Sequence, residues 1–145
     1  MNIIVAVDLS PASSKVIEAA RGVGDLTGVS IYVLHVIETG PDYITYFDAT
    51  DAQRAMVGDD FPREHDALQA LTTKLQDEGL DATEVLLCGP AVETTLAEAE
   101  RLDAGLIVVG THGHAAVYDV LVGSYSAGII RKSKLPVLVV PVRNA

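Results

Sequence analysis

Short apolar runs, each bounded by glycine, proline or polar residues, recur along the chain. The first run, residues 2–7, reads Asn-Ile-Ile-Val-Ala-Val without polar alternation, which is typical of a strand buried on both faces. Four more strands are expected over residues 31–37, 84–87, 106–109 and 137–140. Strands of this kind favour a parallel sheet.

The segments between these strands carry apolar positions at helical spacing. Ser10 and Pro11 predict a cap and a first helical residue after the first strand. Further helices are expected over positions 61–75, 92–99 and 124–132. In the last of these, Ile129 and Ile130 are expected to face inward. Strands that alternate with helices predict right-handed crossovers and a doubly wound α/β sheet.

The stretch from Glu38 to Asp60 interrupts this alternation, because it contains two glycines, a proline and many acidic residues. We expect a mobile surface segment there, with one short helix near residues 52–56. No repeat and no domain boundary is evident elsewhere, so a single domain over residues 1–145 is expected.

Composition and isolated reactive side chains exclude several classes of function. The 145 residues carry a formal net charge of −10, so a broad basic surface for nucleic acid is not expected. No apolar run is long enough to cross a bilayer, and Cys88 is the only cysteine, which excludes an internal disulfide. His35 is expected to be a core histidine with satisfied hydrogen bonds, and His65 to be solvated. A cytoplasmic protein without membrane insertion or redox function is predicted.

The segment after the fourth predicted strand carries the strongest chemical signal. It has Gly110 and Gly113, then nine residues, then Gly123 followed by Ser124 and Ser126 at a helix start. Glycines let backbone N–H groups approach a phosphate, and a helix N-terminus favours the same negative charge. An acidic residue at the end of the first strand points to the same crevice, which favours this interpretation over a tight loop and a helix cap. We therefore expect a lysine-free phosphate cradle in which both serines donate to phosphate oxygens.

Other kinds of site have weaker support. His112, His114 and Asp119 lack further metal ligands, so no metal site is expected. The chain has no Gly-Lys-Ser or Gly-Lys-Thr triplet and no Gly-x-Ser-x-Gly elbow, which argues against a Walker-type NTPase and against a hydrolase of that kind. Gly22 and Gly24 are interpreted as the C-terminal cap of the first helix.

The spacing of Gly110, Gly113, Gly123 and Ser124 resembles the ATP-binding signature of universal stress proteins. Further segments similar to that family are Ile-Ile-Val-Ala-Val-Asp at 3–8, Leu-His-Val at 34–36, Gly-Pro at 89–90 and Leu-Pro-Val-Leu-Val-Val at 135–140. The resemblance covers nearly the whole chain. It implies a Rossmann-like sheet of five parallel strands, similar to the adenine nucleotide alpha hydrolases, in the order 3-2-1-4-5.

The resemblance also implies a set of nucleotide-binding residues. Ala6, Val7, Asp8 and Val36 would hold adenine and ribose, with Asp8 acting through its carboxylate and Val36 through its backbone. The residues expected around the ribose and phosphates are Val109, Gly110, Thr111, Gly113, His114, Gly123, Ser124, Tyr125 and Ser126. The loop over 114–122 contains no Lys or Arg, so neutralisation is expected from backbone amides, Mg²⁺, or protonation of His112 or His114. The expected ligand is ATP, with ADP and AMP as alternatives.

The last predicted strand indicates how the protein assembles. In the family's strand order, residues 137–140 form an apolar sheet edge, and such an edge is normally protected by pairing. The resemblance therefore implies a homodimer through Val137–Val140. We expect a stress-response sensor or regulator that acts on an unidentified protein partner, not an enzyme. Two alternatives stay open: an interaction module of the same family that binds no nucleotide, and a slow ATP hydrolase.

Overall fold

A computed structural model of the chain describes residues 1–38, 44–45, 60–111 and 123–142. The short helix expected near residues 52–56, and most of the segment from Glu38 to Asp60, lie outside the described residues. Within the described ranges, no helix has both the length and the apolar character that a membrane crossing requires.

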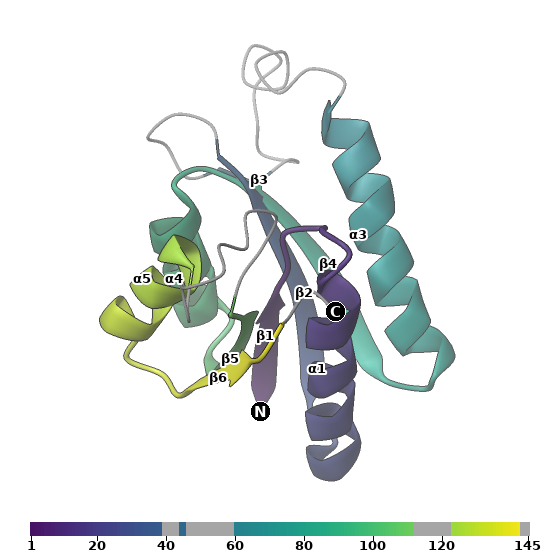
Figure 1. Cartoon of the computed structure of the whole chain (residues 1–145). Coiled ribbons are helices and arrows are strands. Elements are labelled where there is room, and N and C mark those ends of the chain that lie inside the picture. The colour runs from purple at the N-terminus through teal and green to yellow at the C-terminus, as the bar shows by residue number, and fades with distance from the viewer. Residues whose placement is uncertain (39–43, 46–59, 112–122, 143–145) are drawn as a thin grey trace.

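A parallel sheet forms the centre of the fold (Figure 1). Its five parallel strands are β1 (Asn2–Ala6), β2 (Ser30–Ile37), β4 (Asp81–Cys88), β5 (Ala104–Gly110) and β6 (Val137–Val140). They lie in the order β4-β2-β1-β5-β6, which confirms the predicted order 3-2-1-4-5. A sixth strand, β3 (Ile44–Thr45), pairs antiparallel with the end of β4 and was not predicted. Two residues are too few to show a hydrophobic period.

Four described helices cover the two faces of this sheet. They are α1 (Ser13–Thr27), α3 (Asp60–Asp77), α4 (Ala91–Arg101) and α5 (Ser124–Lys132). Figure 1 shows α1 and α3 on one face and α4 and α5 on the other. The predicted doubly wound arrangement is therefore confirmed.

Alternate residues of each central strand belong to opposite cores. On β1, Ile3 and Val5 pack in the core that contains α1 and α3, whereas Ile4 packs in the core that contains α4 and α5. All three side chains are fully buried. Burial of such a side chain stabilises the fold by about 1.5–3 kcal/mol. These two cores fix the strands and therefore the positions of the strand ends, where a ligand site is expected.

The first helix ends later than predicted. α1 continues through Gly22 and Gly24 and ends before Gly28, whose φ of 62° is in the left-handed region. A Cβ atom on Gly24 would lie 2.8 Å from Cδ1 of Ile31 on β2. Gly24 therefore permits close packing of α1 on the sheet, and the interpretation of Gly22 and Gly24 as a cap was wrong.

The last helix spans the predicted residues, but one inward assignment was wrong. Ile129 is fully buried, whereas Ile130 is 46% exposed. Successive helix positions are about 100° apart, and on α5 this rotation turns Ile130 toward the surface while Ile129 enters the core. Lys132 near the end of α5 lies 3.0 Å from Glu93 of α4, and this contact joins the two helices that cover the same face.

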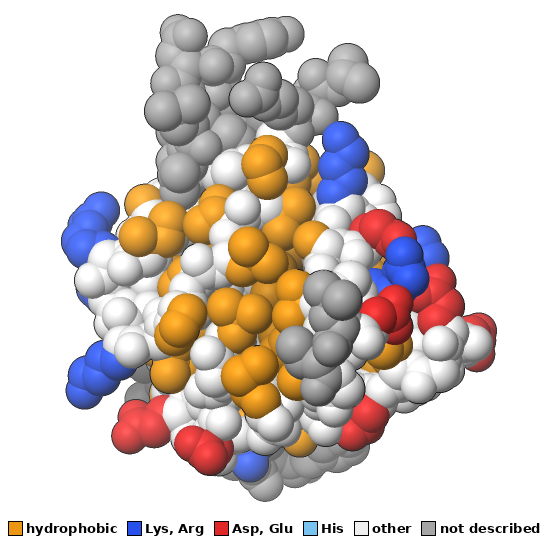
Figure 2. All heavy atoms as spheres, turned by 90° about the horizontal axis from the view of Figure 1, so that it is seen from below, with side chains coloured by type: hydrophobic (Ala, Val, Ile, Leu, Met, Phe, Trp, Pro, Cys, Tyr) orange, Lys and Arg blue, Asp and Glu red, His pale blue; other side chains and the backbone are white. Residues whose placement is uncertain are grey.

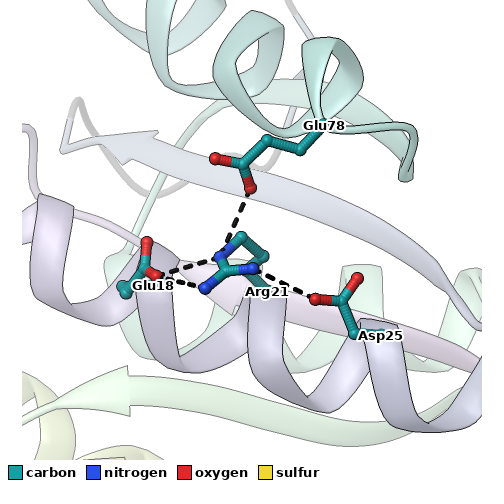
Figure 3. Close-up of polar contacts among 4 residues, drawn as sticks. All are labelled: Glu18, Arg21, Asp25 and Glu78. Carbon is teal, nitrogen blue, oxygen red and sulfur yellow. Dashed lines mark hydrogen bonds and ion pairs between the residues drawn. The ribbon is translucent and has the colours of Figure 1, made fainter.

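A cluster of charged side chains joins α1 to the end of α3 (Figure 3). Arg21 lies 2.6 Å from Glu18 and 3.1 Å from Asp25 on its own helix, and 3.3 Å from Glu78 after α3. The hydrogen bond from Arg21 lowers the pKa of Glu18. These side chains are partly exposed, so the ion pairs contribute little to the stability of the fold.

Apolar side chains also gather on the surface at the end of the molecule where the strands begin. Figure 2 shows them across the middle of this face. Met1, which precedes β1, is 65% exposed, and its side chain lies against Gly105 at the start of β5. The opposite end of the sheet, where the strands finish, carries the cavity described below.

Candidate functional site

A cavity of about 540 Å³ lies at the carboxyl ends of the parallel strands. Its walls come from the ends of β1, β2 and β5, from the first residues of α1, α4 and α5, and from one residue of α3. The lining residues are Ala6, Val7, Asp8, Ala12, Ser13, Val16, Leu34, His35, Val36, Ile37, Glu38, Glu64, Ala91, Gly110, Gly123, Ser124, Tyr125 and Ser126. This is the place at which open parallel sheets bind ligands.

The turn between β1 and α1 positions the carboxylate of Asp8 at the cavity. The Oδ1 atom of Asp8 accepts a hydrogen bond from the Ser10 backbone N–H at 2.9 Å and another from the Ser13 hydroxyl at 3.3 Å. Leu9, which lies between Asp8 and Ser10, has a φ of 64°. This conformation costs a residue with a side chain about 1–3 kcal/mol. The predicted side-chain cap by Ser10 was wrong, because α1 begins only at Ser13 and has no side-chain cap.

The two halves of the glycine signature bond to each other. The Gly123 backbone N–H donates to the Thr111 carbonyl oxygen at 2.6 Å, and the Ser126 hydroxyl donates to the Gly110 carbonyl oxygen at 2.5 Å. A hydroxyl has a single proton, so Ser126 uses its donor within the protein. This bond holds the start of α5 against the end of β5, and donation from Ser126 to a phosphate stays a prediction. Ser124 is exposed and lines the cavity.

Tyr125 fixes α5 to α4 beside the cavity. Thr95 donates its hydroxyl proton to the Ala91 carbonyl oxygen at 2.8 Å, so the Tyr125 hydroxyl must donate to Thr95, 2.7 Å away. Burial raises the pKa of Tyr125 to about 12. The phenol is therefore neutral at physiological pH, and it acts as a fixed donor between two helices whose first residues line the cavity.

The structure brings most of the predicted site residues together. Those that line the cavity are Ala6, Val7, Asp8, Val36, Gly110, Gly123, Ser124, Tyr125 and Ser126. Val109 is instead buried in the core with α4 and α5, and Thr111 bonds to the chain after β6, where its hydroxyl accepts from the Val142 N–H at 2.9 Å. Gly113 and His114 lie outside the described residues, as do His112 and Asp119. Among the residues that the structure describes, no group of His, Cys, Asp and Glu could hold a metal ion.

Two polar wall residues were missed by the sequence interpretation. His35 on β2 donates from Nδ1 to the Val7 carbonyl oxygen at 2.8 Å, and its Nε2 lies 3.5 Å from Oε1 of Glu64 on α3. The Nε2 atom is buried and has no hydrogen-bond partner, so the expectation that the hydrogen bonds of His35 are satisfied was half right. The only sequence signal was a histidine within an apolar strand, and nothing in the chain indicated that Glu64 would face it.

The cavity wall is acidic. Among the described lining residues, Asp8, Glu38 and Glu64 carry carboxylates, and none is lysine or arginine. An anionic ligand would therefore depend on backbone N–H groups and on the N-terminus of α5.

Comparison with known proteins identifies the family. A model of the universal stress protein family matches residues 1–141. Universal stress protein A homolog 1 of Coxiella burnetii is 32% identical over 140 residues, which cover 96% of this chain and 94% of that protein. The solved structure of a Methanocaldococcus jannaschii protein has a TM-score of 0.83 at 21% identity and covers 99% of this chain and 97% of its own.

A second solved structure shows the same fold with a ligand. It is the universal stress protein from Archaeoglobus fulgidus in complex with dAMP, with a TM-score of 0.70 at 24% identity, and the match covers 97% of each chain. The family model and the Coxiella relative both span nearly all of the sequence, as the sequence resemblance did. The chain therefore belongs to the universal stress protein family.

Proposed function

We propose that this protein binds an adenine nucleotide, preferably ATP, in the cavity at the strand ends, with ADP and AMP as alternatives. The observation that carries the proposal is the convergence of Asp8, Gly110 and the start of α5 on one cavity. Support also comes from the Archaeoglobus relative of the same fold, which is described in complex with dAMP.

The start of α5 is suited to the phosphate groups. The Ala127 N–H makes the first bond within this helix, to the Gly123 carbonyl oxygen, so the N–H groups of the three preceding residues have no partner within the helix. These N–H groups and the helix dipole favour a negative charge. Because no lysine or arginine is among the described lining residues, we expect Mg²⁺ to accompany a di- or triphosphate.

The nucleotide is proposed to act as a signal, so that its binding controls a protein partner during a stress response. We propose a cytoplasmic binding protein without dedicated catalysis, because the sequence holds neither a Walker lysine motif nor a hydrolase elbow. The slow hydrolase alternative requires a product whose formation depends on Mg²⁺ and on Asp8. The interaction-module alternative requires an empty cavity at millimolar nucleotide.

Native mass spectrometry of the purified protein with ATP, ADP or AMP, each with and without Mg²⁺, tests the proposal. We expect one nucleotide per chain, with guanine nucleotides as the control for base selectivity. A protein that stays empty with every adenine nucleotide at millimolar concentration would contradict the proposal and support the interaction module.

Asp8→Ala is expected to weaken nucleotide binding about tenfold or more. The substitution removes a carboxylate that lines the cavity, and a hydrogen bond to a charged group contributes about 1.5–3 kcal/mol. Isothermal titration calorimetry measures the change. Asp66→Ala is the control, because it alters net charge equally at an exposed position of α3 outside the cavity. Equal affinity of both variants would place the ligand away from the end of β1.

The homodimer is also a proposal, and β6 is its proposed interface. β6 ends the strand order and pairs with β5 alone among the described strands, and its Leu138 is 38% exposed. Leu138→Lys is expected to convert the dimer to a monomer, because a lysine on an edge strand opposes pairing with a second edge. Size-exclusion chromatography with light scattering gives the mass. Ile130→Lys, at an exposed apolar residue of α5, is the control, and a mass unchanged in both variants would contradict this interface.

A further inference from the structure

A polar strip lies in the contact between the first turns of α3 and the sheet. Two consecutive residues of α3, Glu64 and His65, face the side chains of two neighbouring strands. Glu64 lies 3.5 Å from His35 of β2, and His65 lies 3.4 Å from Glu84 of β4. Only the first pair lines the cavity. The strip therefore contains two pairs of the same chemistry, one at the proposed ligand and one away from it.

The hydrogen bond to Val7, the residue after β1, determines the tautomer of His35. The Val7 carbonyl oxygen can only accept, so the proton of a neutral imidazole lies on Nδ1, 2.8 Å from that oxygen. The Nε2 atom then carries a lone pair and faces the carboxylate of Glu64. Both Nε2 of His35 and Oε2 of Glu64 are buried without a hydrogen-bond partner. His35 is 8% exposed, so water does not readily compensate for the missing bond.

One proton would satisfy this pair. If Nε2 is protonated, the imidazolium donates toward the carboxylate, two facing acceptors become an ion pair, and the wall loses one negative charge. The other charged groups around His35 are also acidic. Asp8 after β1 and Glu38 after β2 line the same cavity, and Glu84 of β4 is paired with His65. The negative charge of a bound nucleotide, placed beside these carboxylates, would favour proton uptake further.

We infer that nucleotide binding is linked to the uptake of a proton by the His35–Glu64 pair, so that this pair tunes affinity to the pH of the cell. The inference rests on the proposed nucleotide-binding function. Because binding and protonation are reciprocal, affinity rises as the pH falls, toward a limit of about tenfold per pH unit for one linked proton. Both residues line the cavity, so the ion pair would join α3 to β2 at its wall.

Isothermal titration calorimetry with ATP and Mg²⁺, in buffers of different ionisation enthalpy at one pH, counts the protons taken up. Glu64→Gln is the key variant, because its amide can donate to Nε2 of His35 without any added proton. We expect proton uptake in the wild type and its loss in Glu64→Gln, whose affinity should then depend less on pH. Protons released or bound by ATP itself cancel in this difference.

His65→Asn is the matched control, because it removes the neighbouring histidine of the same strip outside the cavity. It is expected to take up protons as the wild type does. Binding with no proton uptake in the wild type, or equal uptake in Glu64→Gln, would overturn the inference and leave the proposed function intact. Absence of any nucleotide binding by the wild type would instead overturn the proposed function, and the inference with it.

A measurement on the wild type alone tests the inference even if a variant fails to fold. The ¹⁵N chemical shifts of a histidine report which ring nitrogen carries a proton. At constant pH, addition of ATP and Mg²⁺ is expected to move Nε2 of His35 toward its protonated shift, while the ring of His65 stays unchanged. A shift of Nε2 that does not move on saturation with nucleotide would contradict the proton linkage.

Discussion

Ala91→Phe is expected to abolish nucleotide binding while the protein stays folded. Ala91 is the first residue of α4, and its side chain lines the cavity of about 540 Å³. A phenyl ring at this position would occupy the space beside Tyr125 that a base or ribose needs. We expect a loss of at least about a hundredfold in affinity, or about 2.7 kcal/mol, by calorimetry.

The same substitution at Ala97 provides the control. Ala97 lies on α4 but is exposed and does not line the cavity, so Ala97→Phe has a similar effect on helix propensity without filling the site. Circular dichroism checks that both variants fold. If Ala91→Phe and Ala97→Phe bind ATP equally well, the ligand does not enter this cavity, and the site must be sought elsewhere in the chain.

The sheet was predictable because its strands are continuous apolar runs. Residues 2–7 and 137–140 have no polar alternation, and the structure places β1 at the centre and β6 at the edge of the predicted order. The glycine signature was predictable for a similar reason. Its spacing is local in the sequence, and Gly110 and Gly123 do line one cavity. Features that depend on a short-range pattern could therefore be predicted from the sequence.

Features that depend on contacts between distant residues could not be predicted from the sequence. Gly24 could not be distinguished from a helix cap without the position of Ile31 across the α1–β2 contact. His35 was expected to be satisfied, because the facing carboxylate of Glu64 comes from a helix 29 positions away in the sequence. The bond from Ser126 to Gly110 was not predicted, because it becomes visible only when α5 is placed on β5. In each case the missing information was a partner, not a residue type.

Ile129→Ala is expected to destabilise the fold by about 2–5 kcal/mol, because Ile129 is fully buried in the core of α4, α5 and the sheet. The removed methyl and methylene groups leave a cavity that neighbours on β1 and β5 cannot readily fill. At the middle of that range the melting temperature falls by about 10 °C. Urea denaturation gives the free energy of unfolding, and an unchanged slope would show that the two-state transition is retained.

Ile130→Ala tests whether this effect comes from burial. The two residues are adjacent, chemically identical and in the same helix, but Ile130 is 46% exposed. Its replacement is expected to change stability by about 1 kcal/mol or less, since alanine also has the higher helix propensity. Equal losses from both variants would contradict the orientation of α5. Because Tyr125 and Ser126 lie on that helix, an altered orientation would also displace the wall of the proposed nucleotide site, so this comparison of stabilities tests the geometry on which the binding predictions depend.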